Sequence, residues 1–250
     1  MKSKIKNYTK DSESELLNRK SLIDLFNKNP IPNEQVLSNL GLFLDSKNLS
    51  RILLMNHLYK KIINLHGNIF EFGTRWGNNG AIFSSLRSIY EPYNRHRKIV
   101  LFDTFEGLKN INKLDGKNEM MFEKSLSTTK DYIKYLDSLM KTQESLNPLS
   151  HIKKYEIVKG DASKKIVGYL KRFPETIISL AYFDFDIYKP TRDVLKAIKP
   201  RLCKGSILAF DELNDSDAPG ETIALMEQVS LNNIKLERFR YASRVSFFQF

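Results

Sequence analysis

Four acidic residues stand where two apolar stretches in the second half of the chain end. Asp184 and Asp186 follow one stretch, and Asp211 and Glu212 follow the next. If both stretches are parallel strands, their carboxyl ends meet at one edge of a sheet, where ligands bind. Carboxylates this close repel one another unless one is protonated or a cation lies between them. Oxygen ligands suit Mg²⁺, Mn²⁺ or Ca²⁺, and a carboxylate can also remove a proton from a hydroxyl. A second interpretation stays open, in which Asp186 and Glu212 cap the helices that follow.

A glycine-rich turn earlier in the chain is the second feature with chemical meaning. Residues 69–72 have the apolar pattern of a buried strand, Gly73 to Gly80 form the turn, and residues 81–89 have the pattern of a helix. This arrangement places backbone N–H groups and a helix N-terminus beside a ligand. The spacing G-x-x-x-G-x-x-G differs from the dinucleotide fingerprint, and the sequence contains no P-loop motif. We therefore expect neither a dinucleotide nor a nucleoside triphosphate; an ordinary turn with a helix-capping glycine is the alternative.

Two carboxylates beside this turn narrow the choice of ligand. Asp103 ends the next predicted strand, where an acidic residue accepts hydrogen bonds from the two hydroxyls of a ribose. Glu71 precedes the first glycine by two positions. A carboxylate there is a poor neighbour for a pyrophosphate but suits a positively charged ligand. Asp103 and Glu71 together favour S-adenosylmethionine as the ligand, because it carries a ribose and two positively charged groups, a sulfonium and an amino group.

These side chains need a scaffold, and the chain after residue 68 alternates between strand and helix patterns. Apolar stretches predict strands at residues 69–72, 99–102, 155–158, 180–183 and 206–210, with helices at 81–89, 162–173, 191–198 and 221–231. This order predicts an α/β fold, Rossmann-like and doubly wound, with a mostly parallel sheet. The last two segments, 235–241 and 244–250, predict a C-terminal antiparallel hairpin that turns at Ala242 and Ser243.

Two segments fall outside this alternation. Helical spacing at residues 14–27, 35–44 and 49–65 predicts an N-terminal helical cap over residues 1–66, followed by the α/β domain over residues 67–250. About fifty residues separate Asp103 from Tyr155, more than a crossover needs. This insertion, about 107–150, contains a predicted helix at 128–146 with Ser127 or Thr128 as its cap. We expect the cap and the insertion to border the substrate pocket, with the insertion as a lid; a surface decoration is the alternative.

The composition argues against several classes of protein. Cys203 is the only cysteine among 250 residues, which excludes an intrachain disulfide and fits a cytoplasmic location. The formal net charge is +11, but the basic residues are scattered and lack the aromatic pattern of a single-strand binder. We therefore do not expect nucleic acid as a partner. We also expect no signal peptide and no membrane span.

The motifs, taken in order, resemble those of the macrocin O-methyltransferase family. These are class I S-adenosylmethionine-dependent enzymes that methylate sugar hydroxyls on natural products, and related members belong to polysaccharide gene clusters. The matching segments are Glu71–Gly73, Leu101–Leu108, Val158–Asp161, Ala181–Tyr188 and Phe210–Glu212. The match spans about residues 50–230, and the run from Phe102 to Leu108 is its most specific part.

The resemblance implies roles for individual residues. The expected cofactor contacts are Glu71, Gly73, Thr74, Asp103, Thr104, Gly160, Asp161 and Asp184. Asp184 and Asp186 are the expected catalytic residues, and Asp184, Asp211 and Glu212 are the expected ligands of Mg²⁺ or another divalent cation.

The sequence departs from the family pattern at three places. Glu212 stands where the family has a second aspartate, and Phe185 stands inside what is usually Asp-Gly-Asp. The turn from Trp76 to Gly80 lacks the consecutive glycines of the family. The departures at Glu212 and Phe185 concern the metal geometry and the acceptor pocket.

We therefore expect an S-adenosylmethionine-dependent methyltransferase that methylates a hydroxyl of a sugar or sugar nucleotide, with assistance from a divalent cation. Its setting would be polysaccharide or natural-product biosynthesis, and a homo-oligomer is left open. Three alternatives stay open as well: methylation of a small-molecule amine or amide, methylation of a nucleic acid, and a Rossmann-like binding subunit without catalysis.

Overall fold

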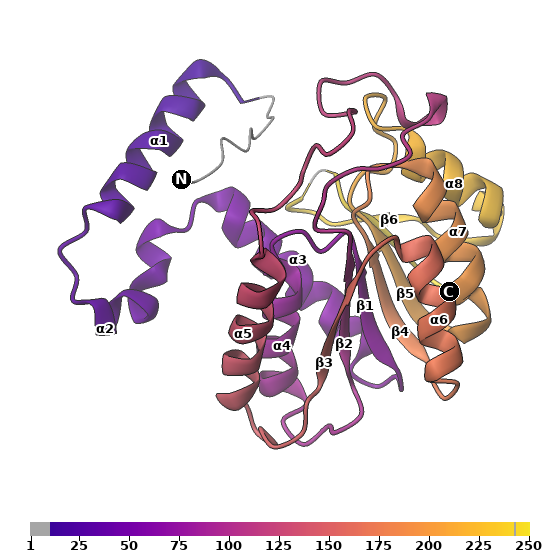
Figure 1. The fold of residues 1–250 in the computed structure, drawn as a ribbon, viewed down its shortest axis with the longest axis horizontal. Coiled ribbons are helices and arrows are strands. Elements are labelled where there is room, and N and C mark those ends of the chain that lie inside the picture. The colour runs from indigo at the N-terminus through magenta and orange to yellow at the C-terminus, as the bar shows by residue number, and fades with distance from the viewer. Residues whose placement is uncertain (1–10, 243) are drawn as a thin grey trace.

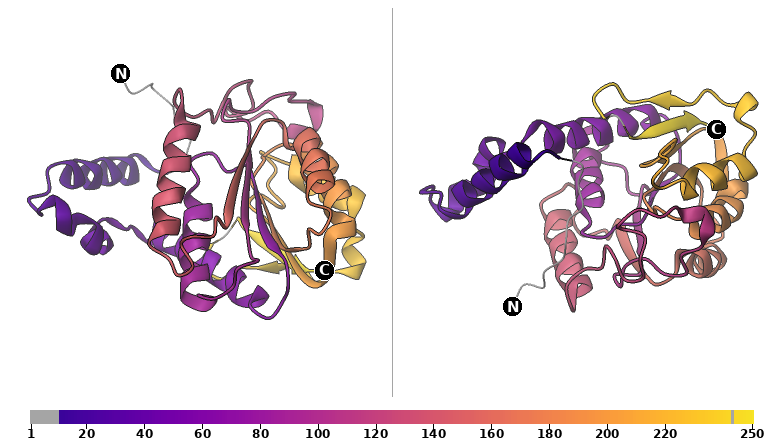
Figure 2. Two further views of the ribbon diagram at one scale, coloured as in Figure 1. Left: turned by 60° about the horizontal axis from the view of Figure 1, so that its bottom comes forward. Right: turned by 90° about the horizontal axis from the view of Figure 1, so that it is seen from above.

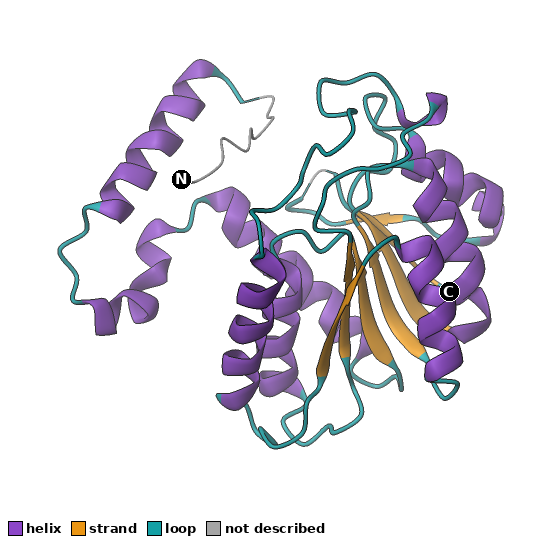
Figure 3. Ribbon diagram, viewed as in Figure 1, coloured by secondary structure: helices purple, strands orange, loops and turns teal. Residues whose placement is uncertain are grey.

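A seven-stranded sheet with helices on both faces forms the body of the protein (Figures 1 and 3). The computed structural model describes residues 11–242 and 244–250. The strand order is β3-β2-β1-β4-β5-β7-β6, and the pairings among β1 to β5 are all parallel. The strand order reverses between β1 and β4. In doubly wound sheets, ligands bind at the carboxyl ends of the strands on either side of such a reversal. The predicted fold class is confirmed.

The five parallel strands lie within one to four residues of their predicted bounds. They are β1 (Asn68–Phe72), β2 (Ile99–Asp103), β3 (Tyr155–Lys159), β4 (Ile178–Phe183) and β5 (Leu202–Phe210). Their apolar runs are continuous because helices cover both faces of the sheet. Along β1, Ile69 packs into one core and Phe70 and Phe72 pack into the other. The strands therefore end together at one edge, where the acidic residues follow.

Two groups of helices cover the sheet (Figure 1). One face carries α3 (Ser46–Ile62), α4 (Asn78–Tyr90) and α5 (Tyr132–Ser145), and the other carries α6 (Ala162–Arg172), α7 (Tyr188–Ile198) and α8 (Gly220–Gln228). Short 3₁₀ turns occur at η2 (Lys113–Asp115), η3 (Lys199–Arg201) and η4 (Leu231–Asn233). No helix among the described residues is long and apolar enough to cross a membrane.

The first helices project from this body as an arm (Figure 2). The arm consists of α1 (Glu13–Asn27), α2 (Asn33–Val36) and η1 (Leu37–Phe43), and none of these elements contains a buried residue. The predicted single helix at 35–44 is therefore wrong in detail, because α2 gives way to a 3₁₀ segment with a kink at Asn39. Residues 1–10 of the predicted cap lie outside the described part of the chain. The division into cap and domain stays a prediction.

The long insertion after β2 contains one α-helix, α5, and loops that are attached to the body. The predicted start of α5 at residue 128 is wrong: Asp131 has a φ of 60°, which breaks the helix before Tyr132. The buried carboxylate of Asp115 accepts a hydrogen bond from the backbone of Tyr188 at 2.6 Å. Because Asp115 lies in the insertion and Tyr188 begins α7, this contact fixes the loop beside the sheet edge.

The chain ends in the predicted hairpin. Strand β7 (Ser246–Gln249) pairs antiparallel with β5 and with β6 (Glu237–Arg238), so the hairpin extends the parallel sheet. The strands are shorter than the predicted segments. Ser243, in the predicted turn, lies outside the described residues.

Candidate functional site

A cavity of about 540 Å³ opens at the carboxyl edge of the sheet, and a smaller one of about 160 Å³ adjoins it. The larger cavity is lined by residues that follow β1 to β5 and by the insertion loop from Thr104 to Leu126. Four residues line both cavities: Arg51, Gly73, Arg75 and Asp184. Among the described residues before β1, Arg51 of α3 lines the cavities, and no residue of α1, α2 or η1 does. The predicted cap therefore borders the cavities through α3, whereas the described part of the arm does not.

The turn after β1 is held close to the end of β4. Gly73 has a φ of 91°, and a Cβ atom there would lie 1.8 Å from the carbonyl oxygen of Asp184. Any other residue would therefore separate β1 from β4. Gly77 has a φ of 79° and starts α4 in the left-handed region. These glycines bring the α4 N-terminus to the smaller cavity.

Glu71 forms the floor of the smaller cavity. Its side chain is buried, and Asn79 donates a hydrogen bond to Oε1 at 3.0 Å. Its other oxygen, Oε2, is buried and has no hydrogen-bond partner among the described residues. Burial raises the pKa of Glu71 to about 8, against the opposing effect of the Asn79 hydrogen bond. A ligand cation would restore the ionised form of this carboxylate.

Arg75 brings positive charge to the same cavity. Its backbone has a φ of 47°, which is uncommon for a residue other than glycine. The guanidinium Nε and Nη2 are buried and find no hydrogen-bond partner in the part of the chain that the structure describes. Unpaired donors of this kind are costly unless a ligand completes them. A carboxylate-and-ammonium ligand would pair with Arg75 and Glu71, so the residues fit the amino-acid end of S-adenosylmethionine.

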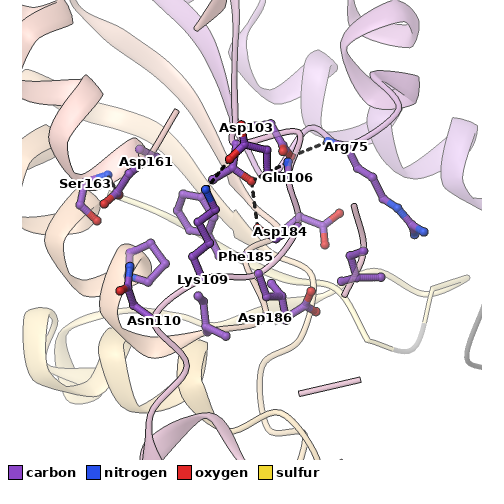
Figure 4. Close-up of a pocket in the computed structure, with 18 of the residues that line it drawn as sticks. Arg75, Asp103, Glu106, Lys109, Asn110, Asp161, Ser163, Asp184, Phe185 and Asp186 are labelled. Carbon is purple, nitrogen blue, oxygen red and sulfur yellow. Dashed lines mark hydrogen bonds and ion pairs between the residues drawn. The ribbon is translucent and has the colours of Figure 1, made fainter. Parts of the chain in front are cut away.

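Asp103 and Asp161 both line the larger cavity (Figure 4). Asp103 accepts hydrogen bonds from the backbone N–H of Arg75 at 2.7 Å and of Phe105 at 2.5 Å. Burial raises its pKa, although these hydrogen bonds oppose the shift. Asp161 caps α6 by accepting from the Ser163 backbone at 3.0 Å. These backbone N–H groups fix the orientation of both carboxylates at the cavity.

The remaining predicted cofactor residues lie between these two aspartates. Thr104 and Gly160 line the larger cavity, and the Thr104 hydroxyl donates to the carbonyl oxygen of Gly107 at 2.9 Å. Thr74 lines the smaller cavity. All eight predicted cofactor contacts therefore line one or both of two adjoining cavities, and Gly73 and Asp184 line both.

The acidic cluster lies at the ends of β4 and β5, as predicted. Burial raises the pKa of Asp184 well above its usual range, and the negative charges of Asp211 and Asp186 add to this shift. Burial, followed by the charge of Asp211, raises the pKa of Asp186 to about 6. For Asp211 burial favours protonation, but Arg51 and the hydroxyl of Tyr182 outweigh it and lower the pKa. Among Asp184, Asp186 and Asp211, Asp211 is the one whose ionised form the surroundings favour.

Two arginines engage the carboxylates that we expected to hold a metal. Arg51 Nη1 lies 2.6 Å from Asp211 Oδ1 and Nη2 lies 3.4 Å from Oδ2, while Arg244 contacts Glu212. Within residues 11–242 and 244–250, no three carboxylate, histidine or cysteine side chains are arranged to hold a metal ion. Asp211 and Glu212 as arranged do not fit a divalent cation, since an oxygen of each already pairs with an arginine, whereas no ion pair engages Asp184 within the described residues.

The helix-capping alternative for Asp186 and Glu212 is wrong. The N-cap residues of α7 and α8 are Ile187 and Pro219, and neither helix has a side-chain cap. Asp186 instead has a φ of 61° and a buried side chain at the cavity wall. A strained backbone at a pocket is typical of functional positions.

Sequence analysis missed four residues of this site. Arg51 and Arg75 carry its positive charge, Tyr182 donates to Asp211 at 2.5 Å, and buried Glu221 accepts from the Phe185 backbone at 2.8 Å. For Arg75 the sequence did contain a signal, since an arginine between Gly73 and Gly77 lies in the turn that was expected to border the ligand. Tyr182 lies inside the motif Ala181–Tyr188, but no local pattern marks Arg51 or Glu221, because they come from helices distant in the sequence.

Comparison with known proteins finds close structural relatives. The crystal structure of CalS11, named a calicheamicin methyltransferase, matches with a TM-score of 0.95 and 36% identity over 97% of this chain and 95% of that one. The apo structure of CalS11, named a TDP-rhamnose 3'-O-methyltransferase, matches with a TM-score of 0.86 and 34% identity over 97% of each chain. The O-methyltransferase NovP shares the fold, with a TM-score of 0.58 and 15% identity over 94% of this chain and 98% of its own. No family model and no curated protein match the sequence.

Proposed function

Because this chain belongs to the macrocin O-methyltransferase-like family of class I S-adenosylmethionine-dependent methyltransferases, we propose that it methylates a hydroxyl group of a sugar nucleotide. The relative with 34% identity is named for that substrate class, and the likeness extends over 97% of both chains. The cavity edge carries carboxylates suited to a hydroxyl acceptor. The activity class follows from the family; the acceptor is our proposal.

The observation that carries the cofactor assignment is the pair of unsatisfied groups beside β1. Glu71 Oε2 and Arg75 Nε and Nη2 are buried without hydrogen-bond partners in the described chain. One small cavity contains both side chains, and they differ in charge. The α-ammonium and α-carboxylate of S-adenosylmethionine complete both. Asp103 at the end of β2 would then accept hydrogen bonds from the ribose hydroxyls of the cofactor.

The residues of the acidic cluster would serve the acceptor. The bound cofactor would supply the methyl group: a carbon–oxygen bond to the acceptor would form as the carbon–sulfur bond breaks, with S-adenosylhomocysteine as the leaving group. The hydroxyl proton passes to a carboxylate, for which Asp184 and Asp186 both line the larger cavity. Alignment of oxygen, carbon and sulfur supplies the larger share of the rate acceleration.

The divalent cation that we expected from the sequence has no part in this proposal. No step of the proposed transfer depends on one, because Asp211 and Glu212 are engaged by Arg51 and Arg244 in the described arrangement. We also propose a cytoplasmic location and a role in natural-product or polysaccharide biosynthesis; the single cysteine and the family support these proposals.

Mass spectrometry of reaction mixtures tests the proposal. The protein is incubated with methyl-labelled S-adenosylmethionine and a panel of TDP- and UDP-sugars, and we expect one labelled methyl group on a sugar hydroxyl. The Asp103→Ala variant is the control, because it lacks the ribose contact and should bind cofactor more weakly by about 1–3 kcal/mol. Transfer to amines or amides and not to sugars would replace this acceptor class by the N-methyltransferase alternative.

A further inference from the structure

The cluster at the ends of β4 and β5 contains its own cation. Arg51 comes from α3, and its Nη1 donates to Asp211 Oδ1 at 2.6 Å. The same nitrogen lies 2.5 Å from the Tyr182 hydroxyl, which itself donates to Asp211. Both oxygens of Asp211 therefore face the guanidinium, and Oδ1 accepts two hydrogen bonds, from Arg51 and from Tyr182.

Helix α3 fixes the position of this guanidinium. Buried side chains of α3, among them Leu54, Met55 and Leu58, pack in the core beside the sheet. The neighbouring Ser50 hydroxyl donates to the carbonyl oxygen of Tyr241 at 2.7 Å. Arg51 is therefore presented by a rigid helix, and its side chain is 31% exposed. A divalent cation at Asp211 would stand beside this fixed positive charge and be repelled by it.

In the described part of the chain, no ion pair joins Asp184 or Asp186 to an arginine. The negative charge of Asp211 raises the pKa of both Asp184 and Asp186. Arg51 opposes this rise for Asp184, and Arg244 and Arg75 oppose it for Asp186. Glu212, which stands where the family has an aspartate, contacts Arg244, and the same guanidinium lies 3.5 Å from Asp215. Arginines thus surround the group of carboxylates from α3, from the β1 turn and from the approach to β7.

We infer that Arg51 takes the place of a divalent cation in this chain: it neutralises Asp211 and closes that carboxylate to metal ions. Asp184 and Asp186 then stay free of metal and available for the acceptor hydroxyl. The inference deepens the proposed function and rests on it for the acceptor, but the exclusion of metal from Asp211 can be measured without turnover.

Binding of Mn²⁺, followed by electron paramagnetic resonance and by calorimetry, tests the inference. We expect no binding to the unmodified protein at millimolar Mn²⁺. Arg51→Met removes the charge at similar length and should strengthen Mn²⁺ binding at least about tenfold, because uncompensated carboxylates attract a cation. Arg51→Lys keeps the charge and should not gain affinity. Arg95→Met is the matched control, since Arg95 is exposed in the loop before β2.

The double variant Arg51→Met, Asp211→Asn locates the ion, because it should lose the affinity that Arg51→Met gains. One Mn²⁺ bound tightly by the unmodified protein and lost in Asp211→Asn would overturn the inference. Absence of binding in Arg51→Met, with thermal unfolding unchanged from Arg51→Lys, would overturn it too, because the carboxylates would then form no cation site. If Arg51→Met does not fold, Arg51→Gln takes its place.

Activity separates this inference from the proposed function. Methyl transfer to a sugar nucleotide should be unchanged in excess EDTA, and loss of transfer on chelation with recovery in Mg²⁺ would contradict the role of Arg51. No transfer to any sugar nucleotide, with or without metal, would refute the proposed acceptor and leave the Mn²⁺ result standing.

Discussion

At the scale of single residues, the site combines buried groups whose charges are incomplete without a ligand. Glu71 is the clearest case, because its carboxylate is buried with one oxygen unpaired. Arg75 is its counterpart in the same cavity, with two unpaired nitrogens. Such groups destabilise the free protein and are completed on binding. The same groups therefore predict how cofactor affinity responds to pH.

Cofactor affinity should rise with pH up to about 8. Burial raises the pKa of Glu71 to about 8, so the free protein carries this carboxyl protonated at neutral pH. An ammonium group binds the ionised form, and binding therefore releases a proton below that pKa. Affinity should increase by up to about tenfold per pH unit and level off above it. Calorimetry with S-adenosylhomocysteine between pH 6 and 9 measures the effect.

Two comparisons isolate Glu71 in that experiment. Glu71→Gln should remove the pH dependence, because the amide does not titrate. Adenosine, which lacks the amino-acid end, should bind the unmodified protein with no such dependence. A slope that persists in Glu71→Gln would assign the proton to another group.

At the scale of elements, the contact between the ends of β1 and β4 determines the site. Gly73→Ala should lower stability, because its Cβ would lie 1.8 Å from the Asp184 carbonyl oxygen and a φ of 91° disfavours alanine. Gly168→Ala, within α6 and with nothing within 4 Å of its Cβ, should raise stability by about 0.5–1 kcal/mol. Urea unfolding of both variants measures the difference. Equal effects would mean that the turn can relax without cost.

The insertion loop is the second element that matters for the site. Several residues between Thr104 and Leu126 line the larger cavity. Asp115 attaches part of this loop to the N-terminus of α7. We expect amide protons of residues 107–130 to exchange more slowly once cofactor and sugar nucleotide are bound, since both ligands would lie under the loop. Hydrogen exchange by mass spectrometry measures this, with the arm helix α1 as the internal reference. Unchanged exchange would argue against a lid.

At the scale of the whole molecule, a buried ionic network joins the insertion to the sheet. Glu144 of α5 lies 2.6 Å from Arg87 of α4 and 2.7 Å from Lys154 just before β3, and all three side chains are at most 4% exposed. Glu144→Ala would leave the two buried cations Arg87 and Lys154 without their carboxylate partner. The change should lower the free energy of unfolding by about 3–5 kcal/mol. Exposed Glu119→Ala is the control and should cost little. A loss below about 1 kcal/mol would show that water compensates the cations.

The sequence by itself determined the sheet and the row of residues at its edge. Continuous apolar runs identify the buried parallel strands, and each run ends at a residue of the site, as Phe102 leads to Asp103 and Phe183 leads to Asp184. Local periodicity contains this information, because a strand buried on both faces has to be apolar along its length. The family resemblance of the same motifs is confirmed by the match to CalS11.

Only the tertiary structure decided which charges meet. Arg51 and Asp211 are 160 positions apart, and Arg244 reaches Glu212 across 32 positions. Short-range patterns say nothing about such pairs, because their distance depends on how α3 and the C-terminal strands pack against the sheet. From the sequence we therefore predicted a cluster of carboxylates with a metal ion as its counter-charge. In the folded chain, the packing of distant elements places arginines beside these carboxylates instead.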